Sequence, residues 1–263
     1  MAEEPTGDNR MNERVAAWLG AHLDWAPARI EELSGGLSHR SWRLTTPDRS
    51  GVLKLDAAPR DWPGNSRAEE AGIQQAAARA GLAASVYWHS AQGILTEWID
   101  GPVLGAATLR VEHVLRDVGA ALRRLHALPP SQRRFDFGRW AAHYRELLGT
   151  SGHLDQAACT ACDWLESVSL PGPFVLSHND LVPANITAGA GIRFLDWEYA
   201  ANNSWLFDLA AVHVEAALDA DATAVLFAGY SDNAQVPGEF ADAVVAYRHL
   251  VRLWESSALP AVS

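Results

Sequence analysis

The sequence is poor in the features that mark secreted and membrane proteins. Its 263 residues include two cysteines, Cys159 and Cys162, too few for a disulfide scaffold. A redox motif would follow a strand, and a zinc site would need further ligands nearby. The two cysteines have neither, so we expect them to be small apolar residues on a helix. No run of 18 apolar residues occurs, and the polar, acidic N-terminus lacks the apolar core of a signal peptide. We therefore expect a cytoplasmic protein without a membrane partner.

Basic side chains are outnumbered by acidic ones. Lys and Arg total 21 against 32 Asp and Glu, which gives a formal net charge of −11. Such a surface repels a phosphodiester backbone, so we expect no nucleic-acid partner, whereas a cationic substrate is compatible with it. The apolar fraction of 48% is ordinary for a soluble globular protein, and the length allows one lobed domain or two small ones.

Strand patterns come first along the chain. After a helical stretch at residues 11–24, three short strands are predicted within residues 33–55, the first two joined by a glycine turn. An alanine-rich helix at 66–80 follows, and two further strands are predicted at 85–89 and 93–99. These strands predict a small antiparallel sheet.

Helical spacing dominates beyond residue 100. Helices are predicted at 111–126, within 139–167, at 206–218 and at 238–259. The exception is the segment 174–197, where apolar runs alternate with turns. Strands followed by helices predict an α+β fold, with a sheet-rich N-lobe at residues 1–100 and a larger helical C-lobe at residues 101–263.

The densest group of polar residues in an apolar setting lies at 174–198. An apolar strand leads into a loop that carries Asp180 and Asn185, and a second apolar strand delivers Asp196 and Glu198. A hairpin would bring Asp180, Asn185 and Asp196 together. Phosphoryl transfer needs one carboxylate to accept the hydroxyl proton, and an amide oxygen with a second carboxylate to hold Mg²⁺. The spacing of these three residues matches the kinase pattern.

The segments HNDLVPAN and LDWEYAANNSWLFDLA resemble the choline kinase and aminoglycoside phosphotransferase superfamily. The resemblance is closest to thiamine kinases and choline/ethanolamine kinases and covers roughly residues 30–255. It implies a two-lobed, protein-kinase-like fold with ATP as co-substrate and Mg²⁺ or Mn²⁺ as cofactor. The residue roles that it implies are Asp180 as base, Asn185 and Asp196 as metal ligands, and His178 and Asp208 as supports of the catalytic loop.

The first hundred residues supply candidates for the nucleotide site. The glycine turn that contains Ser38 falls where a phosphate-covering turn belongs, because glycine lets the backbone approach phosphate closely. Lys54 lies in an apolar strand, where a lysine needs a partner. We expect it to contact the ATP phosphates and Glu70 of the next helix, with the adjacent Glu69 as the alternative.

The lobe connector and the acceptor pocket provide the remaining candidates. Glu97 and Ile99 fall where the family's lobe connector would offer its backbone to adenine. Glu198 follows Asp196 by two residues, so on a strand both side chains would share a face, and its carboxylate could neutralise a cationic acceptor. Aromatic faces for that cation are expected from the residues that follow the catalytic motifs, namely Tyr199, Trp205 and Trp254.

Three functions remain open. The first is a kinase of a small cationic alcohol, thiamine ahead of choline or ethanolamine. The second keeps the fold but takes an aminoglycoside or a sugar, for which the acidic residues of the last third, Glu215 among them, show no evident clustering. The third is a non-catalytic nucleotide-binding module, which would lack Asp180, Asn185 or Asp196, and none of them is missing. The expected partners are ATP and a small acceptor, in a monomer or a homodimer.

Overall fold

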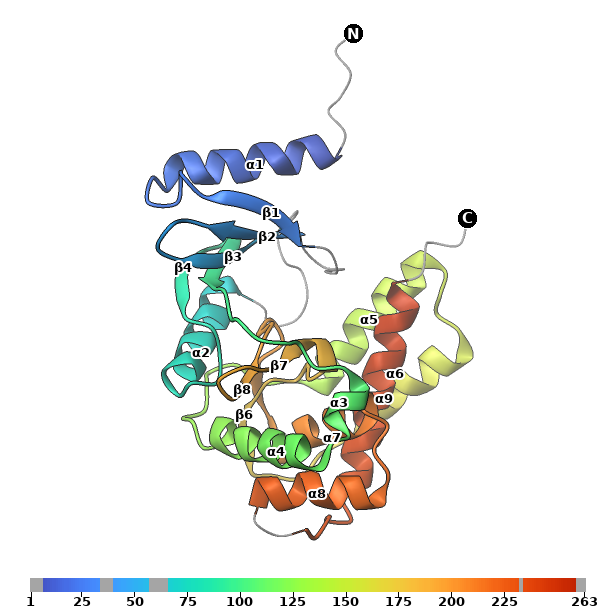
Figure 1. Cartoon of the computed structure of the whole chain (residues 1–263). Helices are drawn as coiled ribbons and strands as arrows, with labels where there is room; N and C mark the ends of the chain where they lie inside the picture. Colours follow the sequence, from blue (N-terminus) through green and yellow to red (C-terminus); the bar gives the residue numbers. More distant parts are fainter. Residues whose placement is uncertain (1–6, 34–39, 57–65, 232–233, 259–263) are drawn as a thin grey trace.

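A computed structural model of the chain describes residues 7–33, 40–56, 66–231 and 234–258 (Figure 1). The strands of the first hundred residues form one sheet, and most of the later chain is helical. The predicted α+β, two-lobed fold is confirmed. Ser38 and the glycine turn around it lie outside the described residues.

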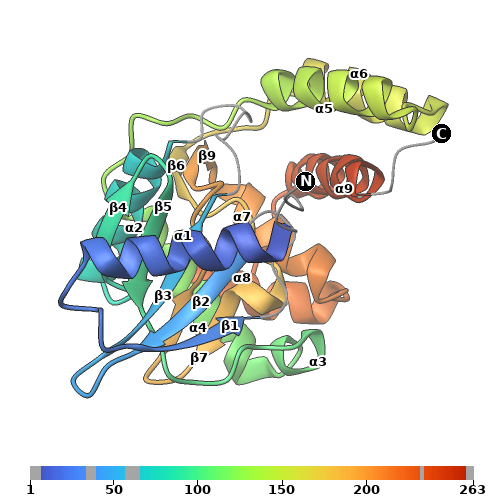
Figure 2. The same cartoon turned by 90° about the horizontal axis from the view of Figure 1, so that it is seen from above.

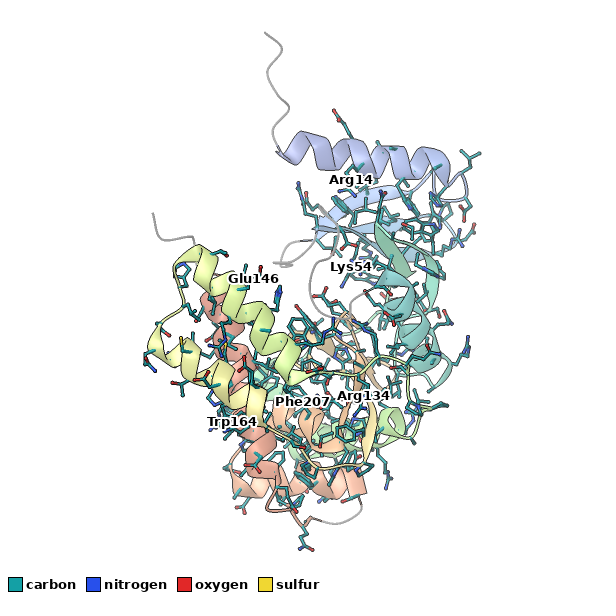
Figure 3. All side chains as sticks on the ribbon, turned by 180° about the vertical axis from the view of Figure 1, so that it is seen from behind. Arg14, Lys54, Arg134, Glu146, Trp164 and Phe207 are labelled. Carbon is teal, nitrogen blue, oxygen red and sulfur yellow. The ribbon has the colours of Figure 1, made fainter. Side chains whose placement is uncertain are left out.

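The N-terminal sheet has five antiparallel strands in the order β1-β2-β3-β5-β4. Their bounds are Arg29–Leu33, Arg40–Thr45, Ser50–Leu55, Val86–Ser90 and Gly93–Glu97 for β1 to β5. Successive side chains alternate between the faces of a strand. Trp42, Leu44 and Leu53 therefore share one face, where they form a core with helix α1 (Gly7–Ala21), which lies across the sheet in Figure 2. Lys54 points to the opposite face, toward the helical lobe (Figure 3).

Helix α2 (Arg67–Arg79) joins the two lobes. It packs beside β4, and its Ile73 and Ala77 belong to the large core of the helical lobe. Just beyond α2, the carbonyl oxygen of Leu82 accepts a hydrogen bond of 2.8 Å from the backbone of Phe194, which lies in the helical lobe. The sheet is thus anchored to the segment that carries the predicted catalytic residues.

The helical lobe contains α3 to α9. Their bounds are Ala106–Leu109, Glu112–His126, Phe137–Ser151, Gln156–Ser167, Trp205–Glu215, Ala220–Ser231 and Phe240–Ser257. The predicted helices are present, and the stretch within 139–167 holds two, α5 and α6. Helix α8 was not predicted, because its apolar residues are spread around the helix instead of forming one stripe. It packs along α4.

Short strands frame the predicted catalytic segment, in a pairing that differs from the expected hairpin. Strand β6 (Phe174–Ser177), which precedes the loop, pairs with β9 (Ala201–Ser204). The hairpin is formed by β7 (Ile186–Ala188) and β8 (Ile192–Phe194) instead. The loop residues therefore precede the hairpin, and Asp196 follows it. Within the described ranges, no helix is both long and apolar enough to cross a membrane.

Candidate active site

The loop between β6 and β7, residues 178–185, is called the catalytic loop here. Its one-turn 3₁₀-helix at Pro183–Asn185 folds Asn185 back over Asp180. The Asn185 amide nitrogen donates hydrogen bonds of 2.9 Å to the backbone oxygen of Asp180 and to its Oδ2 atom. The two residues, five apart in the sequence, are thus in direct contact, and the carboxylate of Asp180 has a fixed orientation.

Asp208 of α7 anchors the start of this loop. It is fully buried, and its carboxylate accepts 2.8 Å hydrogen bonds from the backbone N–H groups of His178 and Asn179. Burial alone would raise the pKa of Asp208, but the hydrogen bonds from His126 and from the His178 backbone hold it below its ordinary value. The ring of His178 contacts the Leu195 carbonyl oxygen through Nε2 at 2.8 Å, and burial lowers its pKa.

Asp180 has the electrostatic setting of a general base. Burial, followed by the negative charge of Asp196, raises the pKa of Asp180 to about 7, while the hydrogen bond from Asn185 opposes that rise. A base whose pKa lies near the working pH combines a useful ionised fraction with a real affinity for protons. The arrangement is therefore suited to removing a proton from a hydroxyl that lies against Asp180.

Asp196 and Glu198 do not lie on a strand, as the sequence analysis expected. Strand β8 ends at Phe194, and Asp196 has a φ of 59°, in the left-handed region. Leu195 N–H still bonds to the oxygen of Asn185 in the register of the β7–β8 pair, and the backbone turns away at Asp196. Strand alternation therefore does not put the two carboxylates on one face, contrary to the prediction, although both line the same cavity.

Lys54 makes its ion pair with Asp196 and not with Glu70. Its Nζ lies 2.9 Å from Asp196 Oδ1, across the space between the sheet and the helical lobe. Glu70 is held by Arg67, one turn earlier on α2, whose NH1 group donates to both carboxylate oxygens at 2.8 and 2.9 Å. The predicted partner was wrong because a neighbouring guanidinium reaches Glu70 within its own helix. Lys54 is also the only lysine of the chain.

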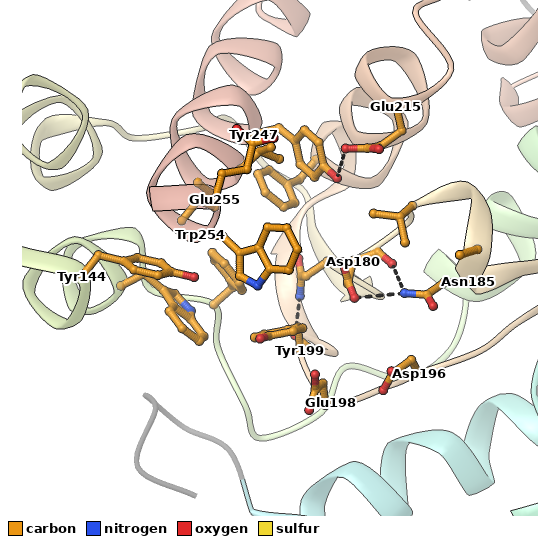
Figure 4. Close-up of a pocket in the computed structure, with 18 residues that line it drawn as sticks. Tyr144, Asp180, Asn185, Asp196, Glu198, Tyr199, Glu215, Tyr247, Trp254 and Glu255 are labelled. Carbon is orange, nitrogen blue, oxygen red and sulfur yellow. Dashed lines mark hydrogen bonds between the residues drawn. The ribbon is translucent and has the colours of Figure 1, made fainter. Parts of the chain in front are cut away.

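A cavity of about 380 Å³ opens beside Asp180 (Figure 4). Of the predicted residues, its lining includes Asp180, Asn185, Asp196, Glu198, Tyr199 and Trp254. Trp205 lies elsewhere: its ring stacks on Tyr230 at 5.4 Å and packs edge-on to Phe227. Trp205 begins α7, and from there its side chain faces α8 instead of the cavity. The expected role of Trp205 in the acceptor pocket was therefore wrong.

Several lining residues were missed. Tyr144 and Trp140 come from α5, Tyr247 and Glu255 from α9, and Glu215 from the end of α7. The hydroxyl of Tyr247 donates a 3.0 Å hydrogen bond to Glu215. A sequence signal existed, since Tyr247, Leu250 and Trp254 recur at helical spacing on one face of α9. It resembles an ordinary core stripe, so only the fold could reveal that this stripe faces a cavity.

The family model described as the phosphotransferase enzyme family matches residues 29–244. The chain belongs to this family. No curated protein sequence matches it. Choline kinase LicA from Streptococcus pneumoniae has a similar structure at 17% identity and a TM-score of 0.77, covering 94% of this chain and 90% of that one. A choline/ethanolamine kinase family protein from Mesorhizobium loti has 24% identity and a TM-score of 0.70, covering 93% and 85%.

A third similar structure is a spectinomycin phosphotransferase, APH(9)-Ia, in complex with ADP and spectinomycin. It has 14% identity and a TM-score of 0.61, covering 93% of this chain and 86% of that one. At these identities the likeness establishes the fold, and the family match adds the reaction type. The protein is a phosphotransferase with the fold of small-molecule kinases.

For a phosphotransferase, the residues beside Asp180 fit a magnesium ion. Asn185 and Asp196 both line the cavity and offer oxygen atoms, the ligand type that Mg²⁺ prefers. The described residues hold no group of three or more His, Cys, Asp or Glu side chains that would suit a metal. Mg²⁺ is commonly bound by one or two protein oxygens together with phosphates and water.

The predicted lobe connector follows the last strand of the sheet. The Glu97 carboxylate accepts hydrogen bonds from the backbone and hydroxyl of Ser85, and its N–H donates to Ser85 as well. The Glu97 side chain therefore ties the start of the connector to Ser85. The next ring, Trp98, lies under the guanidinium of Arg43 at 4.0 Å.

Proposed function

We propose that this phosphotransferase moves the γ-phosphoryl group of ATP onto the hydroxyl of a small organic cation, with thiamine ahead of choline and ethanolamine. One observation carries the proposal. The cavity that Asp180 enters is lined by aromatic rings and by five carboxylates, and its described lining contains no Lys, Arg or His. A cationic acceptor supplies the positive charge that this lining lacks.

The nucleotide would lie between the N-lobe (residues 1–100) and the C-lobe (residues 101–263). Lys54 would contact the phosphates, since it faces the helical lobe and already reaches Asp196. The turn with Ser38 would cover the phosphates, and the backbone around Glu97 and Ile99 would bind adenine. The similar spectinomycin phosphotransferase holds ADP, which supports a nucleotide co-substrate on this fold.

The chemical step follows from the contacts of Asp180. The acceptor hydroxyl would lie against its carboxylate and transfer its proton there as the oxygen attacks phosphorus. Asn185 fixes the carboxylate through its amide nitrogen, which leaves its side-chain oxygen for a metal. Asn185 and Asp196 would hold Mg²⁺, which when bound neutralises charge on the phosphates. The bond from the γ-phosphorus to the bridging oxygen breaks, and ADP leaves.

The acceptor's cation would rest against Tyr199 and Trp254, whose rings line the cavity together with Trp140. Each aromatic face contributes about 0.5–2 kcal/mol to binding a cation, depending on desolvation. Glu198 is buried at the cavity wall, and its charge also acts on Arg67. Glu215 is better placed to meet a cation than the sequence suggested. Among the described residues, only Tyr247 donates a hydrogen bond to it.

An aminoglycoside is the second candidate acceptor. A polycation needs several carboxylates around one cleft, and Glu215 and Glu255 join Glu198 in the lining, a clustering that the sequence did not reveal. Trp254, which is 41% exposed, lies on the same helix as Glu255, so part of this lining opens to solvent. This opening leaves room for an acceptor larger than choline.

A binding panel tests the proposal. Thermal unfolding is measured with Mg²⁺ and a non-hydrolysable ATP analogue, adding thiamine, choline, ethanolamine, an aminoglycoside or a neutral sugar in turn. The true acceptor should raise the unfolding temperature by mass action, and turnover should follow the same ranking. Because Lys54 is the only lysine, it is the only side-chain amine that an amine-reactive probe can label, and ATP with Mg²⁺ should protect the peptide that contains Lys54. Labelling unaffected by ATP would remove Lys54 from the nucleotide site.

A further inference from the structure

A buried chain of hydrogen bonds connects α8 with the catalytic loop. The Asp208 carboxylate accepts from the backbone N–H groups of His178 and Asn179, the two residues directly before Asp180. Its third donor is Nε2 of His126, at 3.1 Å, and His126 is the last residue of α4. Asp208 therefore ties the end of α4 to the backbone that presents Asp180.

The partners of His126 determine its tautomer. An ionised carboxylate only accepts hydrogen bonds, so the proton on Nε2 points at Asp208. In the neutral ring Nδ1 is then an acceptor, and it lies 2.9 Å from the hydroxyl of Tyr230. Burial, with the negative charge of Asp208, raises the pKa of Tyr230 to about 12, so this hydroxyl stays protonated and donates. The hydrogen bonds run in one direction, from Tyr230 through His126 to Asp208.

Close packing of α4 and α8 places Tyr230 over His126. A Cβ atom added at Gly119 of α4 would lie 2.8 Å from the backbone nitrogen of Tyr230, and one at Gly229 would overlap the backbone of α4. The Tyr230 ring is also stacked on Trp205, with 24° between the planes. Trp205 is the first residue of α7. Its ring, which was expected to contact the acceptor, packs against Tyr230 instead.

We propose that His126 and Tyr230 are positioning residues for phosphoryl transfer. Through Asp208 they hold the catalytic loop so that Asp180 meets the acceptor hydroxyl. The role rests on the proposed function of Asp180 as base. Neither His126 nor Tyr230 belongs to the described lining of the cavity. Their loss should therefore lower kcat while leaving KM for ATP and for the acceptor nearly unchanged.

Three variants separate the links of the chain. His126→Leu removes both hydrogen bonds and should lower kcat by about 10- to 100-fold, the scale of a small misplacement of a catalytic group. His126→Gln keeps an N–H donor for Asp208 and an oxygen acceptor for Tyr230, and should recover most of that loss. Tyr230→Phe keeps the stacked ring and removes only the hydroxyl, with an expected loss of about three- to tenfold, the worth of one net hydrogen bond.

His213→Leu is the matched control. His213 also belongs to α7 and also bonds to α8, because its Nδ1 lies 2.8 Å from the hydroxyl of Thr223. Among the described residues, its hydrogen bond and ring contact are with Thr223 and Phe240, not with Asp208 or the catalytic loop. All variants are compared at a temperature at which each is folded. A kcat for His126→Leu no lower than that of His213→Leu, or no recovery in a folded His126→Gln, would overturn the proposal.

Hydrogen exchange gives a readout that needs no acceptor. The amides of His178 and Asn179 donate to Asp208, so they should exchange faster in His126→Leu and Tyr230→Phe than in wild type or His213→Leu. Unchanged exchange at both amides would overturn the positioning role, whatever the substrate. A faster exchange in a protein that phosphorylates none of the acceptors tested would support the positioning of the loop and count against the proposed function alone.

Discussion

The Asn185 amide nitrogen lies 2.9 Å from the Asp180 carboxylate, so one residue orients the candidate base while offering its oxygen to a metal. A change at position 180 that keeps this shape isolates the chemistry of the carboxylate. Substitution of Asp180 tests the base, and substitution of Asn185 or Asp196 tests metal binding, so the variants below examine the two roles independently.

Asp180→Asn should fold and bind nucleotide but lose about 10²- to 10⁴-fold in turnover, because an amide has similar shape and cannot take the proton. Steady-state rates and nucleotide titrations measure the two properties separately. Asp117→Asn, on the exposed face of α4, is the control and should keep both. Near-wild-type turnover in Asp180→Asn would remove Asp180 from the mechanism.

The raised pKa of Asp180 also predicts a pH-dependent gain in stability for the same variant. The folded protein holds this proton up to about pH 7, whereas the ordinary carboxyl loses it near 3.8. The native state therefore binds more protons between these values, and the contribution of Asp180 to stability falls as pH rises through that window. At about 1.4 kcal/mol per unit the full effect is a few kcal/mol.

Asp180→Asn lacks this loss, so its stability relative to wild type should grow from pH 4.5 to pH 7.5 and then level off. Denaturant unfolding of the metal-free protein at both pH values measures the difference, with Asp117→Asn beside it. An equal gain at the two pH values would mean that Asp180 has an ordinary pKa in the folded protein.

The sheet, the order of the lobes and the catalytic segment were predictable because each depends on a local sequence pattern. Strand alternation placed Lys54 on a sheet, and the spacing of Asp180, Asn185 and Asp196 indicated their chemistry. The structure places these three side chains around one cavity. Their functional roles remain predictions.

What the sequence could not supply depends on contacts between distant residues. Lys54 pairs with Asp196, 142 positions away along the chain, because the two lobes face each other. Glu70 was wrongly predicted to pair with Lys54, because Arg67, one turn away on the same helix, forms an ion pair with it. Trp205 was assigned to the pocket by its position after the motifs, and the direction of its side chain depends on α8, a helix whose sequence has no apolar stripe.

Removing either proposed metal ligand should impair the use of Mg²⁺ or Mn²⁺ by the enzyme. Asp196→Ala should abolish turnover, and Asn185→Ala should shift the Mg²⁺ or Mn²⁺ requirement to higher concentration, because Mg²⁺ with one protein ligand is held less well. The measurement is the rate against metal concentration at saturating ATP, with Glu112→Ala on the surface of α4 as control. If both ligand variants kept the wild-type dependence of rate on metal concentration, other residues would have to bind the metal.

The space around two helical glycines, Gly119 at the crossing of α4 and α8 and Gly72 in α2, predicts opposite effects for their replacement by alanine. At Gly119 a Cβ would strike the carbonyl oxygen of Leu226, so Gly119→Ala should destabilise the protein by about 1–3 kcal/mol. At Gly72 of α2 nothing lies within 4 Å, so Gly72→Ala should stabilise it by about 0.5–1 kcal/mol through helix propensity. Unfolding free energies check both, and a stable Gly119→Ala would mean that the helices can separate at no cost.

The acceptor pocket gives the last prediction. The carboxylates of Glu198 and Glu215 line a cavity of aromatic rings without a basic side chain among its described residues. An uncharged acceptor would partly desolvate the carboxylates of this lining without adding a positive charge among them, which is costly. Glu198→Gln and Glu215→Gln should therefore raise KM for the acceptor by about tenfold each, the worth of a charge-assisted contact, and change KM for ATP little.

The matched control is Glu146→Gln, on the exposed part of α5, which should leave both KM values unchanged. Neutral sugars should be poor substrates, because they gain nothing from the carboxylates and little from the ring faces of Tyr199 and Trp254. The decisive comparison is turnover of thiamine, choline and ethanolamine against a neutral sugar at equal concentration. A sugar that turned over faster than all three would refute the cation pocket, while the membership of the chain in the phosphotransferase family would stand because it rests on the match over residues 29–244.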